Sequence, residues 1–170
     1  SVDTHFGFSR YAERLGRSAS SFDELYAALQ GNLSFVDELL VDLLRKKITH
    51  FKPSMVAISV PFPGNLFSAF RCGQWIRQHH PEIKVVMGGG FPNTELRSLS
   101  DPRVFEFFDF ITLDDGEAPL ENLYRHVCGD LGSDQLKRTF ALVDGEVQYI
   151  NNSTCRDYKQ GDVGTPDYRD

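Results

Sequence analysis

Three consecutive glycines, Gly88, Gly89 and Gly90, point most directly to chemistry in this sequence. Because glycine has no Cβ, the backbone there can take a positive φ and approach a flat or anionic group closely. Amide groups exposed in such a turn can also bind phosphate. The same glycines would equally suit a tight strand-to-loop turn that binds nothing, and a short glycine pattern alone does not separate the two interpretations.

A second polar turn, Asp114-Asp115-Gly116-Glu117, offers carboxylates that could accept hydrogen bonds from a ligand hydroxyl or amide. Asp115 or Glu117 could equally cap the helix that follows and complement its dipole. Taken alone, the turn therefore predicts either a ligand contact or a helix cap.

The remaining reactive side chains form no catalytic or metal motif. Cys72, Cys128 and Cys155 are far apart, which favours free thiols in a reducing cytoplasm. The five histidines share no metal-ligand spacing with a carboxylate or thiol. No serine is framed by glycines as a nucleophile would be. We therefore predict neither catalytic nor metal-ligating residues in this chain.

Composition narrows the class of protein. The 170 residues suit one domain, and 41% hydrophobic with 25% charged residues is the usual mix of a globular protein. A net charge of −6 argues against a nucleic-acid surface, which is usually basic. No apolar run approaches the length of a bilayer span, and no signal peptide is visible, so we expect a cytoplasmic protein without a membrane partner.

Hydrophobic periodicity predicts four helices. Residues 22–29 form a short one that Ser21 can cap and Gly31 ends, and residues 35–48 form a longer one with a single apolar face. A third helix over 65–80 has an inner face of Leu66, Ala69, Phe70, Gly73 and Ile76, with Arg71, Gln74, Arg77 and Gln78 facing water. The fourth carries Pro119 in its first turn and buries Leu120, Leu123, Tyr124 and Val127.

Strands are predicted at 55–60, 83–87 and 110–113, where β-branched apolar residues cluster. The first reads as a strand covered on both faces. Asp144-Gly145 between two apolar runs predicts a β-hairpin. Phe105, Phe107, Phe108 and Phe110 either form core or stack on a planar ligand. The chain thus divides into a helical front (1–52), an alternating core (53–137), a hairpin (138–151) and a linker (152–170).

Strands alternating with helices imply right-handed βαβ units and a mainly parallel sheet. Ligands of such sheets bind beyond the carboxyl ends of the strands. The turns that matter are therefore residues 59–65, 88–94 and 114–117.

Read in order, these turns resemble the cobalamin-binding domain that precedes the radical S-adenosylmethionine (SAM) barrel in many enzymes. The resemblance is carried by Val56-Ala57-Ile58-Ser59-Val60, Lys84-Val85-Val86-Met87-Gly88-Gly89-Gly90, Phe108-Asp109-Phe110-Ile111 and Asp115-Gly116-Glu117. Thr165-Pro166-Asp167-Tyr168 is similar to the segment that leads those chains into the barrel. The likeness covers residues 53–170 and implies a Rossmann-like (flavodoxin-like) three-layer α/β sandwich with a C-terminal hairpin and an extended tail.

By this resemblance, the strand-end turns would hold the nucleotide tail of cobalamin. Ser59, Val60, Pro61 and Phe62 would line one side, Gly88, Gly89 and Gly90 would give close access to the backbone, and Asp115, Gly116 and Glu117 would close the other side. The chain would be an accessory piece of a longer cytoplasmic enzyme, a methyltransferase or a related Fe–S oxidoreductase. A downstream radical SAM domain would carry the [4Fe–4S] cluster and SAM.

Three features depart from that family. The two further strands that usually precede the helical front are not found, and the three-cysteine cluster motif is absent. Asp3-Thr4-His5-Phe6-Gly7 is one residue short of the Asp-x-His-x-x-Gly loop that supplies a cobalt ligand in many cobalamin domains. The alternative is therefore a structural or partner-docking domain that keeps the fold without the ligand.

Overall fold

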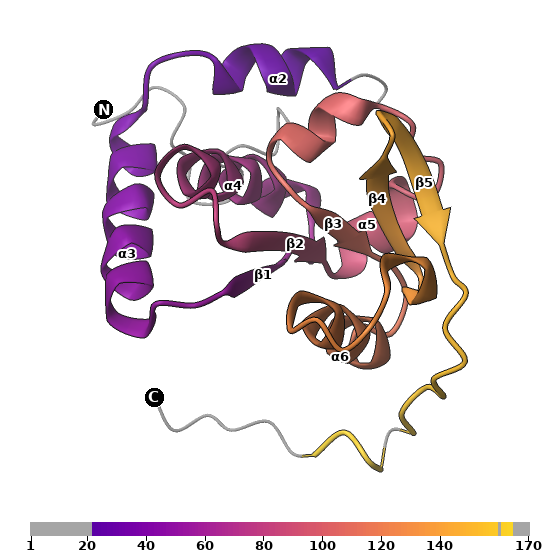
Figure 1. Ribbon diagram of the computed structural model, residues 1–170. Coiled ribbons are helices and arrows are strands. Elements are labelled where there is room, and N and C mark those ends of the chain that lie inside the picture. The colour runs from indigo at the N-terminus through magenta and orange to yellow at the C-terminus, as the bar shows by residue number, and fades with distance from the viewer. Residues whose placement is uncertain (1–21, 160, 165–170) are drawn as a thin grey trace.

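The computed structural model describes residues 22–159 and 161–164 (Figure 1). Its helices are α2 (Asp23–Leu29), α3 (Phe35–Phe51), α4 (Leu66–His79), α5 (Gly90–Glu95) and α6 (Glu117–Val127). Its 3₁₀ turns are η1 (Pro63–Asn65), η2 (Pro102–Glu106) and η3 (Ser133–Gln135). Its strands are β1 (Met55–Ser59), β2 (Lys84–Gly88), β3 (Phe110–Thr112), β4 (Thr139–Val143) and β5 (Glu146–Ile150).

The five strands form one sheet in the order β1-β2-β3-β4-β5. β1, β2 and β3 are parallel, and β4 and β5 add as an antiparallel hairpin. Asp144 and Gly145 both have positive φ, as a tight hairpin turn requires. The Rossmann-like α/β sandwich and its hairpin are thus confirmed, although only three of the five strands are parallel.

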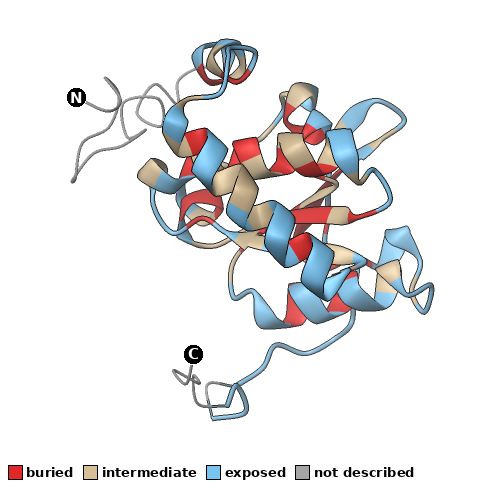
Figure 2. Ribbon diagram, turned by 90° about the vertical axis from the view of Figure 1, so that its left-hand side faces the viewer, coloured by how far each residue is buried: buried red, intermediate tan, exposed pale blue. Residues whose placement is uncertain are grey.

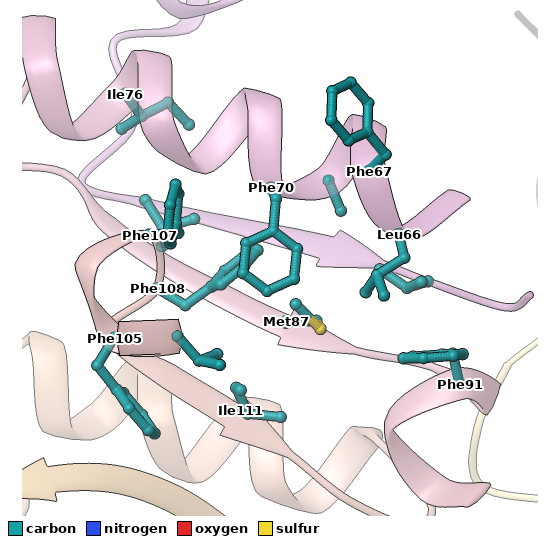
Figure 3. Packing of buried hydrophobic residues seen from close by; sticks show 14 of the residues in the cluster. Leu66, Phe67, Phe70, Ile76, Met87, Phe91, Phe105, Phe107, Phe108 and Ile111 are labelled. Atoms are coloured by element: carbon teal, nitrogen blue, oxygen red, sulfur yellow. The ribbon is translucent and has the colours of Figure 1, made fainter. Parts of the chain in front are cut away.

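Helices cover both faces of the sheet. In Figure 1, α4 lies on one side of β1 and β2 with α2 and α3 packed around it, while α6 lies on the opposite side. The larger core fills the α4 side, where Phe70, Phe107 and Phe108 meet edge to face (Figure 3). A smaller core around Val86 and Leu123 fills the α6 side. Phe105, Phe107 and Phe108 are buried, which confirms the core interpretation for these three.

Helix α4 is held tightly against the chain below it. Its five predicted inner residues are all buried. A Cβ at Gly73 would lie 2.6 Å from the Phe107 carbonyl oxygen, so only glycine permits this approach. This close contact is with the segment before β3 rather than with a strand.

Arg71 does not face water, contrary to the prediction, because its side chain is only 3% exposed. Its guanidinium lies 3.6 Å from the Asp37 carboxylate and donates to the Leu29 carbonyl at 3.0 Å. Asp37 also closes a capping box with Ser34 at the start of α3. A helical pattern assigns polar residues to solvent, and it misses this buried ion pair joining α2, α3 and α4.

The apolar face predicted for α3 is only partly buried. Leu39 is 52% and Leu43 61% exposed, and Ile48 is the buried apolar residue of the helix. Figure 2 shows α3 crossing the front of the molecule with mainly exposed and half-buried positions. The periodicity found the helix correctly but not what its apolar stripe would contact.

Two other burial predictions were wrong. In α6, Leu123 is buried, but Leu120 and Tyr124 are exposed, and Ala118, Pro119 and Asn122 are buried instead. In β1, Ala57 and Ser59 are exposed, so this face of the strand is not covered by the described residues. The short elements α5 and η2 were not predicted, because fewer than two turns carry no periodic signal.

Several predictions fall on residues that the structure does not describe, namely the Ser21 cap, the His5 segment and Thr165–Tyr168. In the described part of the tail, residues 151–159 form no helix or strand. No helix among the described residues is long and apolar enough to span a membrane.

Candidate functional site

The three predicted turns follow β1, β2 and β3 at one edge of the sheet. Ser59 pairs with Gly88 in the β1–β2 register, so the ends of these strands are adjacent. β3 is the parallel neighbour of β2, and Asp114 follows two residues after its end. The fold thus brings all three sequence-predicted segments to the carboxyl edge, where α/β sheets bind ligands.

The glycines of this edge are packed against the protein itself. A Cβ at Gly89 would lie 2.8 Å from the Val60 nitrogen, and one at Gly90 would lie 2.9 Å from the Pro61 carbonyl oxygen. Gly89 also has a φ of 104°, which side-chain-bearing residues rarely adopt. Seating the turn against the segment after β1 is therefore enough to require glycine at these positions.

Val60 links the turn after β1 to the turn after β2. Its side chain is fully buried, its N–H donates to the Gly88 carbonyl at 2.7 Å, and its carbonyl accepts from Phe91 at 2.9 Å. Ser59 and Pro61 are exposed beside it, and Phe62 is 69% exposed. The surface offered by this segment is thus one hydroxyl and one bare aromatic ring, while Val60 only holds it in place.

The turn after β3 is fixed by residues that sequence reasoning missed. Asp114 has a φ of 61°. The Asn93 side chain bonds both its N–H and its carbonyl, and the guanidinium of Arg97 pairs with its carboxylate. Arg138 donates to the Asp115 carbonyl at 3.1 Å. Asn93 lay within the turn flagged as 88–94, but Arg97 and Arg138 carried no sequence signal.

Neither Asp115 nor Glu117 caps α6 through its side chain. Gly116 stands at the N-cap position without a side-chain bond, and Glu117 is the first helical residue, where its charge complements the helix dipole. Asp115, Gly116 and Glu117 are all exposed, and a Cβ at Gly116 would meet nothing within 4 Å. This turn is the open part of the edge.

The residues at this edge suit contacts to a cofactor's periphery rather than to a metal. A ring, a hydroxyl, a backbone turn and two carboxylates can stack on or bond an amide-rich organic molecule. Among the described residues, no group of three His, Cys, Asp or Glu side chains could hold a metal ion. Among the described residues, this edge thus offers stacking and hydrogen-bonding groups without a cluster of metal ligands.

The described histidines lie at the other end of the sheet. His50 comes near the end of α3, just before β1, and the His80 carbonyl accepts from Ile83 just before β2. The His126 ring lies 5.7 Å from that of Phe110, the first residue of β3. None of the described histidines therefore lies among the turns at the carboxyl edge.

Comparison with known proteins gives one informative match. No protein-family model matches the chain, and no curated protein matches its sequence. The structure is similar to the apo, selenomethionine-labelled structure of OxsB, a cobalamin-dependent SAM radical enzyme, with a TM-score of 0.54 and 21% identity. The fold is shared with part of OxsB. The match covers 68% of this chain and 16% of OxsB, so the chain corresponds to a small part of that enzyme.

Proposed function

We propose that this chain is a cobalamin-binding accessory domain of a radical SAM enzyme. The observation that carries the proposal is the coincidence of two independent findings. The fold is similar to part of a cobalamin-dependent SAM radical enzyme, and the turns that the resemblance singles out come together at the ligand-binding edge of the sheet. The radical chemistry would belong to a domain outside these residues, with cobalamin supplying a group-transfer centre.

The contacts would come from the exposed part of the edge. Phe62 would stack on an apolar surface of the cofactor, and the Ser59 hydroxyl would bond an amide. Asp115 and Glu117 would accept hydrogen bonds beside the open Gly116. Gly88, Gly89 and Gly90 would contribute mainly by seating the turn, because the space beside them is already filled by protein atoms.

The test is retention of hydroxocobalamin by the chain, measured as the visible spectrum of the desalted mixture. We expect the wild-type chain to retain the cofactor, and Phe62→Ala and Gly116→Leu to lose most of it. Phe51→Ala is the matched control, because Phe51 is 65% exposed but lies at the end of α3, near the opposite edge. Phe51→Ala should therefore retain the cofactor as the wild type does.

Either of two outcomes contradicts the proposal: no cobalt absorbance on the wild-type chain, or equal retention by Phe62→Ala and Phe51→Ala. The observation that supports the alternative, a structural domain without the ligand, is the internal packing of the glycines. It predicts that wild type and all three variants emerge equally free of cobalamin.

A further inference from the structure

The tail after β5 is docked on the domain rather than running free. The backbone N–H groups of Asn152 and Ser153 both donate to the Leu136 carbonyl, at 3.1 and 3.3 Å. The buried side chain of Asn122 donates to the Ser153 hydroxyl at 3.1 Å. These contacts hold the first residues of the tail between α6 and the segment before β4.

Two adjacent cations hold the next part of the tail. The buried Lys137 ammonium donates to the Cys155 carbonyl at 2.6 Å and lies 3.5 Å from the Asp157 carboxylate. Arg138 donates to the same carboxylate at 2.6 Å. The Tyr158 hydroxyl, one residue on, bonds Glu121 of α6. Residues 152–159 therefore form a strap with a contact at almost every second position.

Arg138 connects this strap to the turn after β3. One guanidinium nitrogen reaches both Asp157 in the strap and the Asp115 carbonyl in the turn, and its Nε lies 3.9 Å from the Asp114 carboxylate. Its backbone carbonyl accepts from the Leu113 N–H at 2.9 Å. The side chain is only 14% exposed, so its rotamer is set by these partners. The planar guanidinium also holds a second nitrogen, Nε, near the Asp114 carboxylate, and the single ammonium of a lysine cannot reproduce this fixed arrangement.

We propose that Arg138 is a positioning residue that transmits the docking of the strap to the Asp114–Gly116 turn. When the strap is docked, Asp157 holds the guanidinium over the turn and the Asp115 carbonyl is satisfied. When the strap leaves, Arg138 loses its strongest anchor and the turn loosens. The direction in which the chain leaves the domain thereby sets the order of one wall of the candidate site. The inference depends on these contacts alone and not on cobalamin binding.

Residue-resolved amide hydrogen exchange of the 170-residue chain tests this inference. Asp157→Asn removes the charge on the strap without touching Arg138 or the turn. Because the lost pair is an exposed one, exchange at Leu113 and Asp114 should rise about two- to fivefold, together with exchange at residues 153–158. Arg138→Ala should raise exchange at Leu113 and Asp114 at least as much, and Arg138→Lys should restore only part of the protection.

Arg156→Ala is the control, because it removes an exposed guanidinium from the same strap that makes no hydrogen bond or ion pair with the described residues. It should leave the Leu113 and Asp114 amides as in the wild type. If Asp157→Asn frees the strap but leaves those two amides unchanged, docking is real and the transmission is refuted. If neither region responds, both are refuted. Urea unfolding of each variant separates these local changes from global loss of stability.

Discussion

At the scale of single residues, the candidate edge divides into positions that hold the fold and positions that face outward. Val60 and Gly89 belong to the first kind, since one is fully buried and the other sits in a backbone conformation reserved for glycine. Phe62 and Gly116 belong to the second, being exposed or adjacent to open space. The sequence predicted all four as ligand contacts, because residue type does not reveal which way a turn faces.

This division predicts different costs for two glycine substitutions. Gly89→Ala should destabilise the chain by about 1–3 kcal/mol from its backbone conformation alone, and more from the contact with the Val60 nitrogen. Gly116→Ala should change stability by less than about 1 kcal/mol, because its φ of −76° suits any residue. Urea unfolding followed by circular dichroism measures both. Equal costs would mean that the Gly89 turn is not seated as described.

At the scale of elements, the sequence predicted which helices and strands exist better than it predicted which elements they contact. The inner face of α4 and the Asp144-Gly145 hairpin were found correctly, since both depend on short-range periodicity and turn chemistry. The exposed apolar residues of α3 and the burial of Arg71 were not predicted, because both depend on which element packs alongside. The site followed the same rule: its turns were predicted, whereas Arg138, which comes from a distant segment, was not.

At the same scale, we expect the docking of the strap on the domain to depend on pH. The hydrogen bond from Arg138 holds the pKa of Asp157 below its ordinary value of 3.8. A lowered pKa in the docked state means that docking is strongest above that ordinary value and weakens as the pH falls through the docked one. Amide shifts of residues 155–158 should therefore move toward free-chain positions as the pH falls below 3.8.

Asp157→Asn isolates this carboxylate from others nearby, such as Asp114 and Glu121. In the Asp157→Asn variant, the strap should be partly undocked at neutral pH and should respond less to acid than the wild-type strap. A wild-type strap that titrates identically to the Asp157→Asn strap would show that Asp157 does not hold it.

At the scale of the whole molecule, the sheet has an edge without a neighbour among the described residues. β1 pairs with β2 alone, and its sequence Met-Val-Ala-Ile-Ser has none of the charges or prolines that usually protect an edge strand. Ala57 and Ser59 are exposed on this strand, so part of the strand lies open to solvent.

An unpaired edge predicts an alternating pattern of hydrogen exchange along β1. Val60 donates to Gly88 and Ser54 accepts from Lys84, so the N–H groups of Val56 and Ile58 also point toward β2. Those of Met55, Ala57 and Ser59 then point outward and should exchange roughly tenfold faster or more in dilute solution. Uniform protection of all five amides would show that another strand covers the edge, either from a second copy or from elsewhere in the chain.

The order of the strands also bears on how this sheet assembles. Each strand lies beside the one that precedes it in the chain, from β1 to β5, so no pairing waits for a segment made much later. Closing a shorter loop costs less chain entropy, so each strand pairs with the neighbour whose connecting loop is shortest. A chain emerging from the ribosome could lay down this sheet strand by strand, with the β4–β5 hairpin closing last and the strap following it.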